Sequence, residues 1–350
     1  MKLKFKTQDA DTISKIRAYT PPYPCFDVHF IGTEMSTIME RSLFDSLTRA
    51  TELANTTSIP ISKRLAGMRT LSLKNNDWAI GGDEPLAVIA GLNVLEDIGL
   101  ALEIGTELKR ICANLGLTYA FKASFDKANR SSIQSYRGPG INKGLDMLAR
   151  VKAELNVPIC TDVHEPEQSS RVASIADIVQ LPAFLCRQTD LVVSMAEATQ
   201  AAGGILHVKK AQFLAPWDTK NIISKIKEVA PDLGVVLCER GTSFGYNNLV
   251  IDMLGIGAMQ ALGVPVTIDA THAVQLPGAD PRTSGASTGG RRDGVAIIAK
   301  SAIAAGANGV FLEFHTDPDA ALCDAPSCLP IDGAAALLKT LKQLHETVSG

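Results

Sequence analysis

Basic side chains gather where apolar stretches of the chain end. The segment FKASFDKANRSS contains Lys122, Lys127 and Arg130, and two further cations, Lys209 and Arg240, end later apolar stretches. Arginine binds phosphate through a bidentate fork, and lysine binds it as a point charge. Burying a lysine at the end of an apolar strand is costly unless an anion accompanies it. The pattern predicts a site for at least two phosphate or carboxylate groups, although the composition of the first segment alone fits a solvated loop equally well.

A second group of reactive side chains lies late in the chain. His272 stands in DATHAVQ, Glu313 in FLEFH and Asp324 in CDAPS. One histidine and two carboxylates on neighbouring units are a plausible facial set of ligands for a divalent metal. The same groups can equally serve as general acids and bases. The residues alone leave both interpretations open.

The other histidines and the cysteines give less information about function than the two groups above. His207 and His345 are expected to be packing or surface residues, and His164 in TDVHEP is left undecided. Seven scattered cysteines, an odd number, do not have the pattern of a disulfide framework. Free, mostly buried thiols are typical of a reducing compartment, and the N-terminal MKLKFKTQDAD has no apolar signal core. We therefore expect a cytoplasmic protein.

Short apolar stretches alternate with helical patterns from residue 86 onward. The helical stretches 99–115 and 144–155 carry apolar residues at spacings of three and four. Nearly continuous apolar runs are typical of parallel strands that are buried on both faces. The predicted strands are 86–91, 119–124, 158–163, 177–182, 205–210, 235–240, 265–270 and 309–314. Eight such units match a (β/α)8 TIM barrel; a doubly wound open sheet is the main alternative, disfavoured because no G-x-G-x-x-G follows the first strand.

Polar residues stand at or just beyond the end of every predicted strand. In chain order they are Asn93, Lys122, Asp162, Gln180, Lys209, Arg240, His272 and Glu313. In a parallel barrel all strands end at one face, and the active sites of such barrels lie there. The sequence therefore predicts that these side chains share one site.

The first part of the chain differs from the rest. Residues 1–66 contain no recognisable motif, although 35–54 has the pattern of one amphipathic helix. Residues 69–80 alternate loosely around an Asn-Asn pair, which predicts a hairpin. We expect an N-terminal extension of unknown role over 1–66, an accessory or mobile appendage, followed by the hairpin and the barrel domain over 67–350.

Composition excludes several classes of protein. The 350 residues are 46% hydrophobic and 20% charged, which suits a well-cored globular chain. The formal net charge of -3 predicts no basic face and therefore no nucleic-acid partner. No apolar run approaches the roughly 18 residues that a membrane span needs. Small anionic molecules are the expected partners.

Ten segments resemble, in order, those of the 3-deoxy-D-manno-octulosonate 8-phosphate synthases. They are GLNVLE, FKASFDKANRSS, RGPG, TDVHEP, QLPAFLCRQTDL, VKKAQFLAP, ERGTSFGYNNLVIDM, DATHAVQ, GGRR and CDAPSCLP. The resemblance covers residues 67–347 and implies a TIM barrel that condenses phosphoenolpyruvate with arabinose 5-phosphate and water. The products would be 3-deoxy-D-manno-octulosonate 8-phosphate and inorganic phosphate, in the Kdo branch of lipopolysaccharide biosynthesis. KANRSS is the most specific string, since the sister synthases that use erythrose 4-phosphate carry K-P-R-T there.

The resemblance also implies roles for single residues. Those expected to act in the reaction are Asn93, Lys127, Asp162, Lys209, His272, Glu313 and Asp324. Those expected to bind phosphoenolpyruvate are Lys122, Lys127, Lys209 and Arg240, with Ser124, Gln180, Ala183 and Gln212 beside them. The sugar phosphate would be bound by Asn129, Arg130 and Ser131. Arg187 would reach the sugar phosphate of a neighbouring subunit, which implies a homotetramer, and Asp162 would orient the sugar hydroxyls or the attacking water.

Asn93 bears on whether a metal is needed. One class of the family binds a divalent metal through a cysteine after the first strand, together with the equivalents of His272, Glu313 and Asp324. Asparagine stands at the cysteine position and cannot supply a thiolate. The form C-D-x-P-S is that of the metal-free class, whereas QFLAPWDTKN and DATHAVQLPG look more like the metal-dependent members. We predict that the protein requires no metal and no other cofactor.

Two alternative functions remain in view. The first is the same chemistry on erythrose 4-phosphate, which the KANRSS string disfavours. The second is a barrel without catalytic activity that binds sugar phosphates. The intact set of cations together with His272 disfavours this second alternative.

Overall fold

The structure is a computed structural model, and it describes residues 2–5, 27–30, 61, 65, 67–74, 76–280 and 288–349. The chain divides into two compact units, residues 1–59 and 60–350. In the first unit β1 (Lys2–Phe5) pairs in parallel with β2 (Asp27–Phe30), which the sequence analysis did not anticipate. The helix predicted over 35–54 lies outside the described residues. The predicted boundary after residue 66 stays a prediction.

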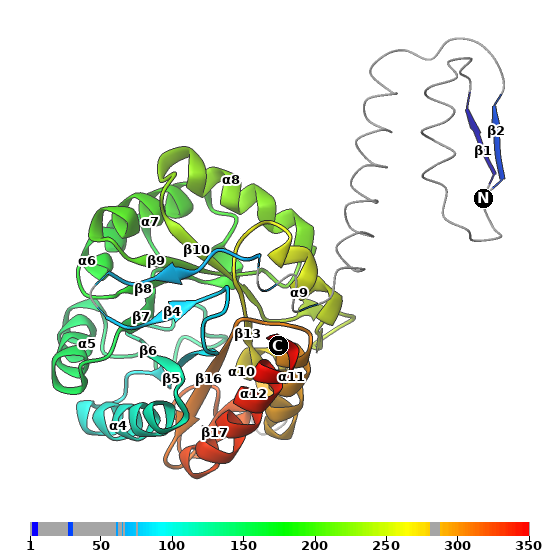
Figure 1. The fold of residues 1–350 in the computed structure, drawn as a ribbon. Helices are drawn as coiled ribbons and strands as arrows, with labels where there is room; N and C mark the ends of the chain where they lie inside the picture. The colour runs from blue at the N-terminus through cyan, green and yellow to red at the C-terminus, as the bar shows by residue number, and fades with distance from the viewer. Residues whose placement is uncertain are drawn as a thin grey trace. The chain divides into compact units, whose positions relative to one another are not determined.

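Eight parallel strands between residues 87 and 315 close into a barrel that helices surround (Figure 1). They are β5 (Ala87–Val94), β6 (Thr118–Ser124), β7 (Ile159–Asp162), β8 (Ile178–Leu181), β9 (Ile205–Lys209), β10 (Gly234–Glu239), β13 (Val266–Asp269) and β16 (Gly309–His315). Pairing of β16 with both β13 and β5 closes the ring. The predicted TIM barrel is confirmed, and the open sheet is excluded because its edge strands would lack partners.

Helices connect the strands and cover the outside of the barrel (Figure 1). They are α4 (Ile98–Leu115), α5 (Ile141–Leu155), α6 (Ser169–Ala173), α7 (Thr189–Ala202), α8 (Lys220–Val229), α9 (Met253–Gln260), α10 (Ala270–Ala273), α11 (Arg292–Ala304) and α12 (Ala334–Ser349). In α4 the Asp97 side chain caps the start by accepting from the backbone N–H of Leu100, and the buried Ile104 and Leu108 face the sheet. None of the described helices combines the length and apolar character that a membrane crossing requires.

Short elements complete the loops. The strands are β11 (Thr242–Ser243), β12 (Leu249–Val250), β14 (Gln275–Leu276), β15 (Gly289–Gly290) and β17 (Leu329–Pro330). The single-turn helices are η1 (Pro166–Gln168), η2 (Ala183–Leu185), η3 (Pro216–Thr219), η5 (Ala325–Ser327) and η6 (Ile331–Gly333). Most of them lie in the loops that follow the C-terminal ends of the barrel strands.

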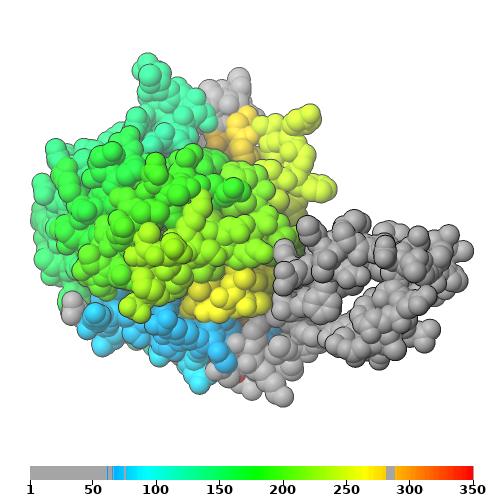
Figure 2. Space-filling model, turned by 90° about the horizontal axis from the view of Figure 1, so that it is seen from above, coloured from blue at the N-terminus to red at the C-terminus, as the bar shows by residue number. Residues whose placement is uncertain are grey.

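A hairpin closes the N-terminal end of the barrel. Strand β3 (Leu71–Ser72) pairs antiparallel with β4 (Ala79–Ile80), which confirms the predicted hairpin. Its buried Trp78 and Ile80 join the apolar cluster inside the barrel, which includes Ile89. Figure 2, turned from the view of Figure 1, shows the hairpin (blue) at one end of the molecule and the loop that follows β6 (teal) at the other. Apolar side chains of this hairpin therefore cover the N-terminal end of the barrel.

The interior of the barrel changes from apolar to polar along its axis. Successive side chains of a strand point to opposite faces, so every second residue points inward. Along β9 the inward residues are Ile205, then His207, then Lys209. Along β6 they include Ala120 and Lys122. The same alternation that builds an apolar base thus places buried charge at the mouth.

Candidate active site

A cavity of about 620 Å³ opens at the C-terminal ends of the strands. Its lining includes thirteen of the residues predicted from the sequence, namely Lys122, Lys127, Asn129, Arg130, Ser131, Asp162, Gln180, Ala183, Lys209, Gln212, Arg240, His272 and Asp324. Three others, Asn93, Ser124 and Glu313, are buried and contact this lining from behind. Arg187 is exposed and does not line the cavity. Distant segments are therefore brought together as expected, and the predicted contact of Arg187 with a neighbouring subunit stays a prediction.

The base of the cavity carries a buried lysine from β6. Lys122 is 1% exposed, and its Nζ donates to Ser124 Oγ at 2.7 Å. Asp162 Oδ1 lies 3.6 Å and Glu313 Oε1 3.9 Å from that nitrogen. Burial, helped by the nearby Lys127, lowers the pKa of Lys122 against the opposing pull of these two carboxylates. An anion in the cavity would favour its charged form.

A local feature of β5 makes room for this lysine. A Cβ at Gly91 would lie 2.2 Å from the carbonyl oxygen of Lys122, so only glycine allows β5 and β6 to approach here. The register between the two strands then shifts between Gly91 and Val94. Such a bulge redirects the residues within it, and Asn93 is one of them.

Lys209 is held from two sides. Its Nζ lies 2.5 Å from Asp269 Oδ2 and 3.8 Å from the centre of the Phe311 ring. Burial would raise the pKa of Asp269, but His272 and Lys209 outweigh it and hold that pKa well below its usual range. Asp269 is therefore an ionised, fully buried anchor that fixes both a lysine and a histidine.

Arg240 keeps a donor available. Its Nη2 donates to Gln275 Oε1 at 3.1 Å, and the side chain is almost fully buried. Its Nη1 is buried and has no hydrogen-bond partner within the described parts of the chain. A buried guanidinium nitrogen without a partner is costly, so an anion in the cavity would satisfy it.

A buried ion pair forms between the chain neighbours of two of these cations, Lys209 and Arg240. Lys210 points away from the cavity, is fully buried, and its Nζ lies 3.5 Å from Glu239 Oε1. The same nitrogen donates to the carbonyl oxygens of Ala211 and Leu214, while Glu239 accepts from the backbone N–H of Arg240. The pair therefore joins the ends of β9 and β10. We call Lys122, Lys127, Lys209 and Arg240 the cationic half of the site.

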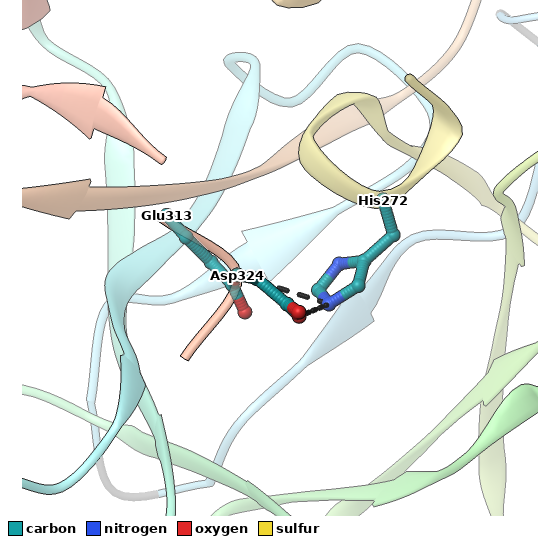
Figure 3. Close-up of side chains that lie close together, drawn as sticks. All are labelled: His272, Glu313 and Asp324. Carbon is teal, nitrogen blue, oxygen red and sulfur yellow. Dashed lines mark ion pairs between the residues drawn. The ribbon is translucent and has the colours of Figure 1, made fainter. Parts of the chain in front are cut away.

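His272 stands at the other side of the mouth, on the single turn α10 that follows β13. Asp269 caps this turn by accepting from the backbone N–H of His272 at 2.9 Å, and its Oδ2 lies 2.8 Å from Nδ1 of the ring. Nε2 lies 3.5 Å from Asp324 Oδ2 and 3.8 Å from Glu313 Oε2. Figure 3 shows the ring directed at both carboxylates. Burial would lower the pKa of His272, but Asp269 and Glu313 raise it, which favours the imidazolium.

Asn93 completes this cluster. Its Nδ2 donates to Glu313 Oε2 at 2.5 Å and to Asp324 Oδ2 at 3.0 Å. We call Asn93, His272, Glu313 and Asp324 the carboxylate half of the site. Two acceptors of this half, Asn93 Oδ1 and Glu313 Oε1, are buried without a hydrogen-bond partner in the described chain, whereas the cationic half retains an unpaired donor.

The carboxylate half has part of the geometry of a metal site. One ligand atom from each of His272, Glu313 and Asp324 lies within 4.8 Å of the others. The remaining neighbour, Asn93, directs an N–H donor at the same carboxylate oxygens that a metal would use. A donor hydrogen cannot coordinate a cation, and an asparagine oxygen in its place is a weak ligand for soft divalent metals. The four residues therefore do not fit a metal site that depends on a thiolate ligand.

A fifth cation of the cavity lies at its rim, on the loop between β6 and α5. Arg130 Nη1 donates to Cys323 Sγ at 2.5 Å and lies 3.9 Å from Asp324 Oδ1. The loop is fastened by Arg137, which forms an ion pair with Asp126. Arg130 therefore offers an anion position at the rim, separate from the base of the cavity.

The undecided His164 belongs to the site. Its Nε2 lies 2.9 Å from Asp162 Oδ2, and it lines the cavity. Burial would raise the pKa of Asp162, but Lys122 and the hydrogen bond from His164 hold it well below its usual range. Asp162 is thus an ionised carboxylate at the mouth.

Sequence reasoning missed Asp269, Gln275 and Phe311. Asp269 had a detectable signal, because it ends a strand three residues before His272. Gln275 and Phe311 had none, since an amide in a loop and a phenyl ring in an apolar strand are both common. Other expectations held: His345 is buried and contacts the carbonyl oxygen of Glu84, and the six cysteines in the described part of the chain are free and buried.

A family profile and similar named proteins agree on the family of this chain. The sequence profile of the DAHP synthetase I family matches residues 59–349. Three similar relatives each bear the name 2-dehydro-3-deoxyphosphooctonate aldolase. The relative from Hahella chejuensis is 49% identical over 80% of this chain and 97% of its own length. That from Pseudomonas syringae is 51% identical over 79% and 95%, and that from Marinobacter nauticus 50% over 77% and 92%. The profile and the relatives cover most of the chain, and the chain belongs to the DAHP synthetase I family.

Proposed function

We propose that the protein is a 2-dehydro-3-deoxyphosphooctonate aldolase, acting as the synthase of 3-deoxy-D-manno-octulosonate 8-phosphate. It condenses phosphoenolpyruvate with arabinose 5-phosphate and water and releases inorganic phosphate. The product supplies Kdo for lipopolysaccharide. The observation that carries this proposal is the presence of two separate anion positions in one cavity, the cationic half at the base and Arg130 at the rim.

Phosphoenolpyruvate occupies the base in this proposal. Its phosphate and carboxylate take the donors of Lys122, Lys127, Lys209 and Arg240, and Ser124, Gln180, Ala183 and Gln212 lie beside them. Arg240 Nη1 supports this placement, because it is buried and lacks a partner within the described residues. Fixed cations lower the cost of bringing two anionic substrates together.

Arabinose 5-phosphate places its phosphate at Asn129, Arg130 and Ser131 and its aldehyde toward the base. The loop that carries these residues is fastened by the ion pair of Arg137 with Asp126. The KANRSS string, residues 127–132, supports the substrate with five carbons over the one with four.

The reaction forms one carbon–carbon bond and one carbon–oxygen bond and breaks one carbon–oxygen bond. Carbon 3 of phosphoenolpyruvate attacks the aldehyde carbon, whose oxygen takes up a proton that comes from water. The water oxygen bonds to carbon 2 and becomes the ketone oxygen when the bond between carbon 2 and the phosphate oxygen breaks, and the second water proton leaves with the phosphate. Asp162, ionised and bonded to His164, orients the sugar hydroxyls or the attacking water. His272, steadied by Asp269, Glu313 and Asp324, holds a proton on the same side.

We further propose that the protein requires no metal, works in the cytoplasm and assembles as a homotetramer. Arg187 is exposed on the loop after β8, outside the cavity of its own chain. The loops after β8, β9 and β10 also expose large aromatic side chains, namely Phe184, Phe213, Phe244 and Tyr246. Exposed aromatic groups of this kind are typical of protein interfaces. A neighbouring subunit on these loops would receive Arg187.

The test is release of inorganic phosphate from phosphoenolpyruvate by the purified protein. We expect release with arabinose 5-phosphate and none with erythrose 4-phosphate. Release with only the tetrose phosphate would keep the chemistry and refute the substrate. Release with neither would favour a barrel that binds sugar phosphates without turning them over.

A further inference from the structure

His207 lies inside the barrel, one step below the cavity. It is fully buried, and its ring stacks on Phe311 with the ring centres 6.3 Å apart. Nε2 lies 2.8 Å from Thr267 Oγ1, and Nδ1 lies 3.3 Å from Gln180 Oε1. The three polar side chains come from β9, β13 and β8 and form one line that ends at the cavity, where Gln180 is part of the lining. A residue that only filled space would not need polar partners that connect it to the cavity.

The ring must be neutral, and a neutral ring has one N–H. Burial lowers the pKa of His207 to about 3, and the neighbouring Lys209 adds to this effect. If Nδ1 carries the hydrogen, it donates to Gln180 Oε1, and Nε2 accepts from the Thr267 hydroxyl. If Nε2 carries it, Nδ1 accepts from the Gln180 amide group, and the Thr267 hydroxyl turns to the carbonyl oxygen of Leu237 at 3.3 Å.

The two tautomers present opposite ends of Gln180 to the cavity. With the hydrogen on Nδ1, the amide oxygen of Gln180 faces the ring, and its NH2 group is left for a ligand. With the hydrogen on Nε2, the amide oxygen is left instead and would face the anion. The first arrangement matches the position of Gln180 Oε1, an acceptor that lies 3.3 Å from Nδ1, and it suits a cavity whose base binds anions.

We infer that His207 is a positioning residue for phosphoenolpyruvate. As the tautomer with its hydrogen on Nδ1, it holds the side-chain amide of Gln180 with the NH2 group directed at the bound anion. The inference rests on the proposed function of the site, and it adds a residue that does not touch the substrate. Stacking on Phe311, which also lies under Lys209, keeps the plane of the imidazole fixed.

The test compares substitutions that keep different parts of the ring. His207→Phe keeps a stacked ring and removes both nitrogens. His207→Asn keeps an amide nitrogen near the position of Nδ1, whereas His207→Gln places its amide near that of Nε2. We expect His207→Phe and His207→Gln to raise the KM for phosphoenolpyruvate roughly three- to tenfold, the loss of one neutral hydrogen bond. His207→Asn should restore it to near the wild-type value, and the KM for arabinose 5-phosphate should not change.

A double-mutant cycle shows whether the effect passes through Gln180. In a Gln180→Met background, His207→Phe should add no further rise in the KM for phosphoenolpyruvate. The matched control is His345→Phe, another buried histidine, which contacts Glu84 and lies outside the cavity. It should leave both KM values unchanged, even if it lowers the melting temperature.

Three outcomes would overturn the inference. They are an equal rise in both KM values for His207→Phe, a rise in His207→Asn as large as in His207→Phe, and additive effects in the cycle. Each would mean that His207 acts on the barrel as a whole. Failure of the proposed function is seen separately, because the wild-type protein would then release no phosphate with arabinose 5-phosphate before any variant is made.

Discussion

The two halves of the mouth carry opposite charges and differ in the kind of atom that is left without a hydrogen-bond partner among the described residues. In the carboxylate half, Asn93 donates to both Glu313 and Asp324, and His272 faces the same two groups. In the cationic half, Arg240 retains a buried nitrogen that has no partner in the described chain. Buried polar groups need partners. Asn93 Oδ1 and Glu313 Oε1 in the carboxylate half are buried without a hydrogen-bond partner in that part of the chain as well. The cationic half therefore needs an acceptor, which an anionic ligand supplies, whereas the carboxylate half needs donors, which protons and water supply.

Removal of the buried ion pair between Lys210 and Glu239, next to the cationic half, should have the largest effect, which is on stability. Lys210→Ala leaves Glu239 buried without its cation, and breaking a buried ion pair from one side costs about 3–5 kcal/mol. We expect a fall of this size in the free energy of unfolding, measured with urea. The double variant Lys210→Met/Glu239→Gln should recover most of it, because neither side chain then carries a charge. A double variant no more stable than the single one would mean that the charges do not matter.

The next largest effect is expected at Arg240. Arg240→Ala removes charge-assisted hydrogen bonds worth about 1.5–3 kcal/mol, which corresponds to a rise of about ten- to a hundredfold in the KM for phosphoenolpyruvate. The KM for arabinose 5-phosphate should stay near its wild-type value. Steady-state phosphate release, with each substrate varied in turn, measures both.

Arg130 provides the matched variant at the rim. Its side chain is 17% exposed, and it should bind the sugar phosphate with help from water. Arg130→Ala should raise the KM for arabinose 5-phosphate by about tenfold and leave that for phosphoenolpyruvate unchanged. If Arg130→Ala and Arg240→Ala weaken the same substrate, the division of the cavity into base and rim is wrong.

A substitution in the carboxylate half should change its ability to bind a metal more than the affinity of the cavity for its substrates. Asn93→Cys replaces an N–H donor with a thiol beside His272, Glu313 and Asp324, which completes a set of soft and hard ligands for a divalent metal. We expect the variant to bind zinc, seen by equilibrium dialysis, and to become sensitive to a chelator. A variant that binds no more metal than Asn93→Ser would show that residue 93 does not reach the cluster in solution.

The smallest effect is expected from a chelator on the unchanged protein. With Asn93 in place we expect phosphate release to be the same before and after dialysis against a chelator. Loss of activity that added zinc, manganese or iron restores would contradict this, and the carboxylate half would then hold a required metal.

Much of the barrel was predictable because its signals are local. All eight strands were predicted, with ends that differ by at most three residues, since strands buried on both faces are nearly continuous apolar runs. The set of polar residues at their ends was also predictable, because strand direction alone brings them to one face. Pairing between β1 and β2 was not, because the alternation of polar and apolar residues in KLKF and DVHF spans only four residues.

Lys209 and Lys210 show the limit of the sequence. Adjacent lysines look alike in the chain, yet one faces the cavity beside Asp269 and the other is buried against Glu239. Which carboxylate accompanies each lysine depends on how neighbouring strands align. The same holds for His207, which looked like a packing residue until Gln180 and Thr267 were placed on either side of it.

The sequence by itself determined the barrel, the chemical type of the site and the absence of a thiolate at position 93, because each follows from residue type and strand period. Only the tertiary structure decided which charges pair, which donor is left for a ligand, and which way the Gln180 amide faces. These depend on contacts between segments tens to hundreds of residues apart, such as Asn93 with Glu313. Separation along the chain carries no information about such contacts until the strands are in register.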